Sequence, residues 1–229
     1  YVLNLEVVLP TGEIIWTGAN VLKNATGYDL TALMIGSEGT LGVITTIVFR
    51  LIPLPTKNIT LFIPFGSVEK ACEAVSAVFR AGIIPSALEF IERDAIDWTL
   101  KYTDVKLQIN DDVKAHLLVE VDGNDMDILY KDCERIFEVM EGFECGEILL
   151  ADSESQKNKI WKLRRSVAEA VKSNSIYKEE DTVVPRAELA KLLKGVKAIG
   201  KQYGFQSVCY GHAGDGNLHV NIIKGEMSD

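Results

Sequence analysis

The chain has 229 residues, of which 47% are hydrophobic and 25% are charged, a composition typical of a globular protein with one or two domains. Its net charge of −9 argues against nucleic acid or an anionic membrane surface as a partner, because both require a basic face. No apolar run approaches the roughly 20 residues of a membrane-spanning helix, and no signal peptide is visible. We therefore expect a cytoplasmic protein without a transmembrane segment.

The N-terminal part of the chain predicts a small β-rich region. Strands are expected at residues 5–9 and 13–16, joined as a hairpin by Pro-Thr-Gly, and at residues 43–51, where β-branched and aromatic residues dominate. A glycine-rich stretch, residues 18–42, lies between the hairpin and the third strand. A Pro-x-Pro run then interrupts the pattern, so we place a domain boundary after residue 57.

Strands and helices alternate in the rest of the chain. Apolar spacing predicts strands at residues 58–64, 87–91, 116–121, 147–151, 182–184, 206–210 and 218–223. It predicts helices at residues 68–81, 93–101, 126–140, 152–173 and 186–203. The first elements follow the order of a split β-α-β unit. We therefore predict an α+β fold, in which an antiparallel sheet is covered by helices on one face.

The four cysteines lie in apolar surroundings and form no Cys-x-x-Cys pair. They are Cys72, Cys133, Cys145 and Cys209. This pattern favours buried, reduced thiols over disulfide bonds or a cysteine-based metal site. Reduced thiols are in keeping with a cytoplasmic protein.

The most informative segment is Gly-His-Ala-Gly-Asp-Gly-Asn-Leu-His at residues 211–219. It contains His212 and His219, two of only three histidines in the chain. A neutral imidazole is a common metal ligand, and Gly214 and Gly216 allow the backbone to turn so that both rings face one ion. A zinc-type site needs at least one further ligand. The alternative is a Gly-Asp-Gly turn with two incidental histidines.

A second glycine-rich segment, Gly-Ser-Glu-Gly-Thr-Leu-Gly at residues 36–42, lacks the Lys-Ser/Thr ending of a P-loop. A predicted strand follows it rather than a helix, so it is not a dinucleotide-binding fingerprint. Its glycines can present several backbone N–H groups to an anion. The alternative is a glycine-rich turn between strands.

These segments resemble the FAD-linked oxidases of the vanillyl-alcohol-oxidase/PCMH type. Lys-Asn-Ala-Thr-Gly-Tyr-Asp-Leu at residues 23–30, followed by residues 35–45, resembles the end of the family's FAD-binding domain. Trp-Lys-Leu-Arg at residues 161–164, Val-Pro-Arg at 184–186 and the histidine segment at 211–221 resemble the C-terminal half. The chain is most similar to the branch that contains D-lactate dehydrogenase, the glycolate oxidase D-subunit and D-2-hydroxyglutarate dehydrogenase.

The resemblance implies an internal fragment with two parts. Residues 1–57 would be the tail of the FAD-binding domain, and residues 58–229 the substrate, or cap, domain. FAD would be the cofactor. The residues implied to line it are Gly36, Ser37, Glu38, Gly39, Thr40, Gly42, Val43 and Ile44.

The resemblance also implies catalytic roles for Arg164, His212, His219 and Asn221. The two histidines would bind a divalent metal (Zn, Mn or Fe) that holds the hydroxyl and carboxylate of a small D-2-hydroxy acid. Arg164 would pair with that carboxylate, for which a guanidinium fork is suited, and Asn221 would lie beside the site. Deprotonation of the metal-bound hydroxyl would drive hydride transfer to the flavin.

Some of these residues have an alternative role. Arg164 could be a solvated charge on its helix, beside Lys162 and Arg165. Asp215 could orient a histidine as a neighbouring carboxylate, or it could stabilise its own turn. The Lys-Glu-Glu-Asp run at residues 178–181 is shifted relative to the D-2-hydroxyglutarate branch, and an acid lies near the place of that branch's lysine, which disfavours a dicarboxylate substrate.

The expected reaction is oxidation of D-lactate or a glycolate-like acid to the 2-keto acid. We expect an electron acceptor that is a protein or a quinone, and we allow for a homodimer. By resemblance, one flavin-binding loop would precede Tyr1 and a third metal ligand would follow Asp229, so the fragment alone is expected to be inactive. The alternative functions are a non-catalytic metal-binding sensor of small acids, an interaction module, and hydrolytic metal chemistry.

Overall fold

The computed structural model describes residues 1–224, which form two compact units. The first unit is Tyr1–Leu54, and the second begins at Pro55. The division falls within the proline-containing run that separates the two sequence patterns. None of the described helices is long and apolar enough to cross a bilayer.

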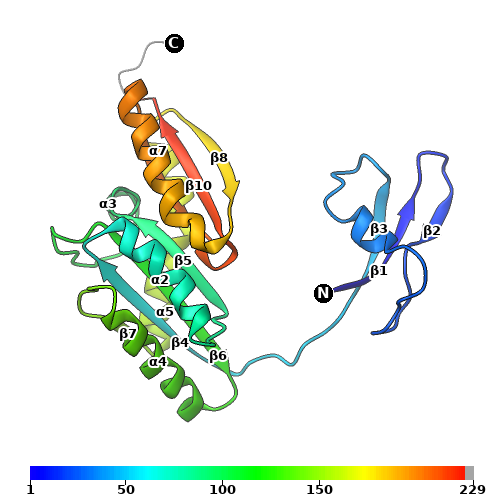
Figure 1. The fold of residues 1–229 in the computed structure, drawn as a ribbon, viewed down its shortest axis with the longest axis horizontal. Helices are drawn as coiled ribbons and strands as arrows, with labels where there is room; N and C mark the ends of the chain where they lie inside the picture. The colour runs from blue at the N-terminus through cyan, green and yellow to red at the C-terminus, as the bar shows by residue number, and fades with distance from the viewer. Residues whose placement is uncertain (225–229) are drawn as a thin grey trace. The chain divides into compact units, whose positions relative to one another are not determined.

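The first unit is a three-stranded antiparallel sheet with one short helix (Figure 1). Strand β1 (Val2–Val8) pairs with β2 (Ile14–Trp16) and with β3 (Val43–Phe49), so the predicted hairpin and third strand are confirmed. Helix α1 (Leu30–Met34) was not predicted, because five residues are too few to show a helical period. Its N-cap is Asp29, whose side chain accepts a hydrogen bond from the Ala32 amide at 2.9 Å.

The second unit is built on a seven-stranded sheet in the order β7-β4-β6-β5-β9-β10-β8. The strands are β4 (Lys57–Phe65), β5 (Ala87–Glu92), β6 (Ala115–Gly123), β7 (Leu149–Ala151), β8 (Tyr177–Val183), β9 (Gln206–Gly211) and β10 (Asn217–Ile223). All the pairings in this sheet are antiparallel. The first four strands have the split β-α-β arrangement, as predicted.

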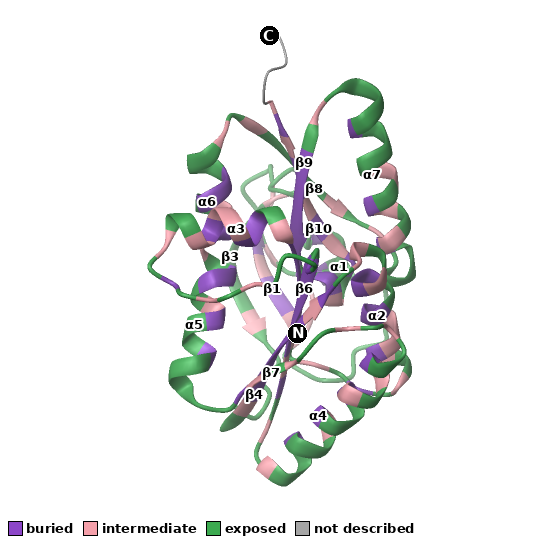
Figure 2. Ribbon diagram, turned by 90° about the vertical axis from the view of Figure 1, so that its left-hand side faces the viewer, coloured by how far each residue is buried: buried purple, intermediate pink, exposed green. Residues whose placement is uncertain are grey.

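Helices cover both faces of the sheet, so the prediction of a single covered face is wrong (Figure 2). One face carries α2 (Val68–Arg80), α4 (Met126–Glu141) and α7 (Leu189–Tyr203), and is named the α2 face. The opposite, α5 face carries α3 (Arg93–Tyr102), α5 (Glu154–Arg165) and α6 (Val167–Asn174).

The central strands explain why both faces are covered. In β6, Leu117 and Val119 pack in the core of the α2 face, whereas Leu118 between them packs in the core of the α5 face. All three are fully buried. A strand that is apolar on both faces must be covered on both faces. Its sequence then shows an uninterrupted run of apolar residues, whereas a strand with one face in water alternates apolar and polar residues.

The long helix predicted at residues 152–173 is two helices, α5 and α6, separated at Ser166. The Ser166 amide donates to the carbonyls of both Lys162 and Leu163, a tightened last turn that ends α5. Helix α5 then packs on β4 and β7, whereas α6 packs on α3. The break therefore lets one apolar stretch cover two different elements.

Strand β8 is longer than its predicted span of residues 182–184. It starts at Tyr177 and pairs with β10 along its whole length. The sequence did not predict its first part because four consecutive charged residues, Lys178 to Asp181, interrupt the apolar pattern. The structure tolerates them because β8 is an edge strand of the described sheet, where side chains reach water.

All four cysteines are free thiols, as predicted. Cys72, Cys133 and Cys209 are buried and Cys145 is half-buried. Burial raises the pKa of the Cys133 thiol to about 11 and raises the pKa of Cys72 and Cys209 further still.

Candidate functional site

Polar side chains gather on the α5 face where β5, β9, β10 and β8 lie side by side. Successive side chains of a strand point to opposite faces. Tyr210 lies opposite His219 in the β9–β10 pairing, and His219 lies opposite Asp181 in the β10–β8 pairing, so the three share one face. Glu89 of β5 alternates with Leu88 and so points to this face as well.

Glu89 is the centre of this group, although the sequence did not single it out. Glu89 is only 5% exposed to solvent. One carboxylate oxygen, Oε2, accepts a hydrogen bond from Arg164 Nε at 2.8 Å and forms an ion pair with Arg164 Nη2 at 2.6 Å. The other oxygen, Oε1, lies 2.7 Å from His212 Nδ1. One buried carboxylate therefore joins two of the predicted site residues.

Arg164 is held in place by its helix and by the sheet. It belongs to the last turn of α5, on the helical face that packs on the sheet, and it is 9% exposed. Its guanidinium carbon lies 5.3 Å from the centre of the Tyr210 ring, within reach of a cation–π contact. The alternative of a solvated surface charge is therefore excluded.

The two histidines of the glycine-rich segment lie close together, as predicted. Their ring centroids are 6.1 Å apart, with the planes inclined at 72°. His219 stacks on Tyr210 with 5.2 Å between ring centroids, and its Nδ1 lies 2.7 Å from Glu179 Oε1. Each histidine thus has a carboxylate at its Nδ1 atom: Glu89 for His212 and Glu179 for His219.

The glycines of this segment have two different structural roles. Gly216 has a φ of +77°, and a Cβ atom there would lie 2.0 Å from the Val184 carbonyl oxygen, so only glycine fits the turn. Gly214 has an ordinary φ but packs on β5, where an added Cβ would lie 3.3 Å from Leu88 Cβ. The turn explains the return of the chain from β9 to β10.

Asn221 lies on β10, two residues beyond His219, and is fully buried. Its Nδ2 donates to the Val208 carbonyl at 3.2 Å, whereas its Oδ1 has no hydrogen-bond partner within the described part of the chain. Burial and the nearby Glu179 carboxylate raise the pKa of the Tyr210 phenol to about 12, so it stays protonated at neutral pH.

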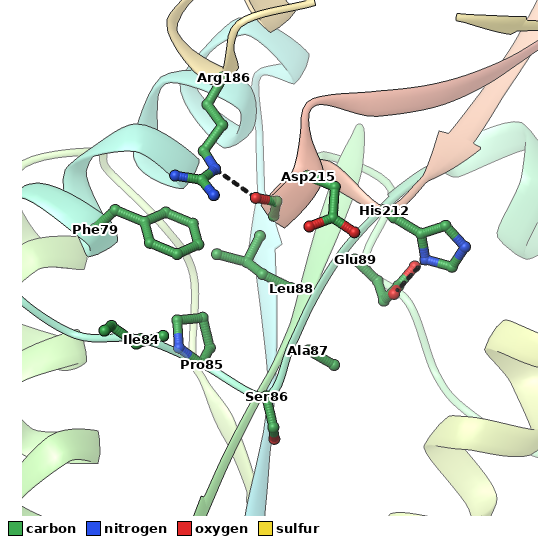
Figure 3. A pocket seen from close by; sticks show the side chains of 11 residues that line it. Phe79, Ile84, Pro85, Ser86, Ala87, Leu88, Glu89, Arg186, His212 and Asp215 are labelled. Carbon is green, nitrogen blue, oxygen red and sulfur yellow. Dashed lines mark hydrogen bonds and ion pairs between the residues drawn. The ribbon is translucent and has the colours of Figure 1, made fainter. Parts of the chain in front are cut away.

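A cavity of about 320 Å³ opens beside His212 at the start of β5 (Figure 3). Its polar lining includes Glu89, Arg186, His212 and Asp215. Arg186 donates to the Gly214 carbonyl and lies over the Phe79 ring at 3.9 Å. The Asp215 amide closes the turn onto the His212 carbonyl at 2.9 Å, and the carboxylate that contacts the His212 ring is Glu89.

Two histidines do not make a complete metal site. Within residues 1–224, no group of three His, Cys, Asp or Glu side chains is arranged to hold a metal ion. A zinc-type site takes three or four protein ligands. The described residues therefore supply at most two imidazoles to an ion. Glu89 is hydrogen-bonded to His212 Nδ1, whereas His219 Nδ1 makes no hydrogen bond within the described part of the chain, although Glu179 Oε1 lies 2.7 Å away.

The predicted FAD segment lies in the first unit. Gly36 and Gly39 have positive φ angles and no heavy atom within 4 Å of an added Cβ, so a ligand could approach their backbone closely. Gly42 has another role, since a Cβ there would lie 2.5 Å from Val7 Cγ1. Val43 and Ile44 are 63% and 40% exposed.

The cavity of the first unit is lined by a different part of the sequence. It has a volume of about 460 Å³. Its lining includes Thr17, Thr31 and the run from Asn24 to Asp29. That run belongs to the stretch that resembles the end of a FAD-binding domain, whereas none of the eight predicted FAD residues lines the cavity.

The fold and site define an α+β domain with a buried polar cluster on one face of its sheet, and comparison with known proteins assigns this domain to a family. Residues 54–229 match the family described as FAD linked oxidases, C-terminal domain. This match covers most of the chain. The chain therefore belongs to the FAD-linked oxidase family.

Curated relatives match along nearly the whole chain. A D-lactate dehydrogenase of Anaerostipes hadrus is 36% identical over 234 residues, which cover 100% of this chain and 49% of that protein. The glycolate oxidase subunit GlcD of Bacillus subtilis is 36% identical and covered to 46%, and a D-2-hydroxyglutarate dehydrogenase of Stutzerimonas stutzeri is 32% identical and covered to 49%. The chain thus spans about half the length of these relatives.

Solved structures share the fold at low identity. A p-cresol methylhydroxylase with substrate bound has a TM-score of 0.69 at 15% identity, covering 96% of this chain and 50% of that one. A 4-ethylphenol oxidase from Gulosibacter chungangensis has a TM-score of 0.64 at 13% identity, covering 97% of this chain and 51% of that one. The expected fold of the vanillyl-alcohol-oxidase/PCMH type is confirmed.

Proposed function

We propose that this chain supplies the substrate-side residues of a flavin-dependent dehydrogenase that oxidises a small D-2-hydroxy acid to the 2-keto acid. The observation that carries the proposal is that buried Glu89 joins Arg164 to His212, with His219 beside the His212 ring and a cavity next to His212. Relatives named as D-lactate dehydrogenase and glycolate oxidase subunit support this reaction over a non-catalytic sensor or interaction module.

The guanidinium of Arg164 binds and orients the substrate carboxylate in this proposal. Glu89 contacts its Nε and Nη2 atoms, which leaves Nη1 facing away from that carboxylate. A rigid guanidinium held in this way can pair with a second carboxylate through its remaining edge. The buried amide of Asn221, whose Oδ1 is unpaired among the described residues, offers an acceptor for the substrate hydroxyl.

His212 holds and moves a proton in this proposal. Because a carboxylate only accepts hydrogen bonds, Glu89 favours the tautomer with the proton on His212 Nδ1. The Nε2 lone pair is then available to accept the proton of the substrate's 2-hydroxyl group. A base at this position assists the departure of hydride from C2.

FAD fits the glycine segment of the first unit, where exposed backbone at Gly36 and Gly39 permits close approach. When bound, FAD supplies the acceptor for the hydride. The residues proposed to hold it are Gly36, Ser37, Glu38, Gly39, Thr40, Gly42, Val43 and Ile44. Reoxidation of the flavin would use a protein or a quinone.

A divalent metal at the two histidines is an alternative to the proton-accepting role of His212. His212, through the same Nε2 lone pair, and His219 would give two ligands to Zn, Mn or Fe, and further ligands would be required. No catalytic step is assigned to the metal for this reason. Metal analysis of the purified protein, compared with a His212→Ala/His219→Ala variant, tests it directly.

Glu179 favours a monocarboxylate substrate. Its carboxylate lies beside His219, and Asp181 Oδ1 is 3.8 Å from the same Nδ1 atom. Two acids at this edge would repel the second carboxylate of a substrate such as D-2-hydroxyglutarate. We therefore propose D-lactate or glycolate as the substrate type.

An anaerobic absorbance spectrum of the FAD-reconstituted full-length protein that contains this chain tests the proposed function. Bleaching of the visible flavin band by D-lactate or glycolate, with little response to D-2-hydroxyglutarate, is the expected result. A flavin band that no 2-hydroxy acid bleaches would overturn the substrate class. Failure to retain FAD would overturn the assignment of the glycine segment.

A further inference from the structure

We propose that Glu89 is a positioning residue that couples Arg164 to His212, and so decides which nitrogen of each side chain faces the substrate. The inference rests on the proposed function, because it concerns the same site. The two oxygens of this one carboxylate each contact a different side chain.

The Arg164 contact fixes the guanidinium. Oε2 of Glu89 lies 2.8 Å from Nε and 2.6 Å from Nη2, so it sits on one edge of the planar group. Tyr210 lies against the guanidinium at 5.3 Å. A guanidinium held at one edge and one face cannot rotate freely, and its Nη1 atom has a defined direction.

The His212 contact fixes the ring and its tautomer. Nδ1 lies 2.7 Å from Oε1 of Glu89, whose oxygens can only accept. The proton therefore stays on Nδ1, and Nε2 carries the lone pair. A carboxylate behind a histidine fixes the orientation and tautomer of the ring in the same way in many functional sites.

Burial of the Glu89 carboxylate is unfavourable unless the carboxylate has partners. The Glu89 side chain is only 7% exposed, and a carboxylate buried to this extent is strongly destabilising unless it is paired. By comparison, Glu179 contacts His219 from the edge strand, with a side chain that is 33% exposed. Glu89 is therefore the carboxylate on which the geometry of the site depends.

The same strand offers a matched control. Glu92 lies three residues further on, points to the opposite face and is also 5% exposed. It pairs with Lys197 at 2.8 Å and accepts from the Cys209 amide at 2.7 Å. Glu92→Gln therefore removes an equally buried carboxylate from β5 without touching Arg164 or a histidine.

The experiment compares Glu89→Gln with Glu92→Gln in two measurements. The first is the tautomer of His212, from ring ¹⁵N chemical shifts without substrate. The second is the affinity of the flavin-loaded protein for 2-hydroxyisobutyrate, a lactate analogue that has no C2 hydrogen to transfer. An amide has a single acceptor oxygen, so the side chain introduced by Glu89→Gln cannot serve Arg164 and His212 together.

Glu89→Gln should change His212 from one tautomer to a mixture and weaken analogue binding about tenfold to hundredfold, as expected for the loss of a supporting carboxylate. Glu92→Gln should leave both measurements near the wild type. If Glu89→Gln does not fold, Glu89→Asp keeps the charge but is one methylene too short for both contacts, and should show a smaller change in the same direction.

Two results would overturn the proposal: an unchanged His212 tautomer in the Glu89 variants, or equal losses of analogue binding in the Glu89 and Glu92 variants. The tautomer is measured without flavin reduction. A wild-type protein that no hydroxy acid reduces, but whose His212 tautomer depends on Glu89, would refute the proposed function and leave the coupling intact.

Discussion

The two faces of the seven-stranded sheet differ in what they do. On the α2 face, helices α2, α4 and α7 cover an extended apolar core that reaches from β4 to β10. On the α5 face, apolar packing extends from β7 to β10, but Glu89 of β5 and His219 and Asn221 of β10 interrupt it. A sheet that is fully packed on one face can therefore carry costly polar groups on the other.

The polar groups of the two faces are also arranged differently. Glu92 and Lys197 form a separate pair on the α2 face, tied to the Cys209 amide. On the α5 face, Glu89 contacts two partners that come from distant parts of the chain. The Glu92–Lys197 pair neutralises one buried charge, whereas Glu89 fixes the positions of two side chains of the candidate site.

The strongest test of this comparison is a core substitution on the α2 face. Ile136→Ala, in α4, removes a fully buried side chain and should lower the free energy of unfolding by about 2–5 kcal/mol, through lost burial and a cavity. Ile128→Ala in the same helix, where the residue is 57% exposed, is the matched control. Urea denaturation measures both. Flavin reduction per folded molecule should stay near the wild type, and its loss in Ile136→Ala would break the division between the faces.

Arg164→Lys, on the α5 face, should lower activity, whereas Ile136→Ala should lower stability. Lysine keeps the charge but lacks the planar fork that contacts Glu89 Oε2 through two nitrogens. Loss of one charged hydrogen bond, about 1.5–3 kcal/mol, should slow anaerobic flavin reduction about tenfold to hundredfold. Arg165→Lys, at the exposed neighbour that lies over Trp161, should have little effect. Equal rates in the two variants would remove Arg164 from the site.

His116 makes the stability of the α5 face depend on pH. The ring stacks on Phe62 with 4.1 Å between centroids, and burial lowers its pKa to about 3. The unfolded chain takes up this proton near pH 6.5, so stability falls as pH decreases from there towards 3, by at most about 1.4 kcal/mol per pH unit. His116→Phe should weaken this dependence in urea denaturation at pH 7.5 and 5.0. An unchanged slope would contradict the assignment.

Glu179→Gln should have the smallest effect. Its contact with His219 comes from an edge strand and is partly exposed to solvent, so the pair is worth about 1 kcal/mol or less. Affinity for 2-hydroxyisobutyrate should change less than about fivefold. A loss as large as that of Glu89→Gln would show that the two carboxylate–histidine contacts are equivalent, which the difference in burial argues against.

Much of the second unit could be predicted because its elements are regular. The strands at β4, β5, β6, β9 and β10 and the helices α2, α3, α4 and α7 have clear apolar periods. The split β-α-β arrangement follows from the order of these elements along the chain. The covering of both faces was not predicted because the continuous apolar run of a strand such as β6 has two interpretations. It fits a strand buried on both faces, and it also fits a strand with one buried face and some apolar side chains on the other.

The candidate site could be predicted only in part. His212 and His219 stand out because glycines and histidines are concentrated in one short segment. Glu89 left one local signal, an acid inside the apolar strand Ala-Leu-Glu-Phe-Ile-Glu. Its partners are 75 and 123 residues away in sequence, so no local pattern could show that it joins them.

The charged run of β8 has a consequence for solubility. An open sheet edge exposes unpaired N–H and C=O groups, to which another chain can add as a further strand. β8 forms such an edge within the described sheet, and Glu179, Glu180 and Asp181 follow one another along it. Two chains meeting at this edge would bring like charges together. The residues that place a carboxylate beside His219 thus also protect the protein against edge-to-edge aggregation.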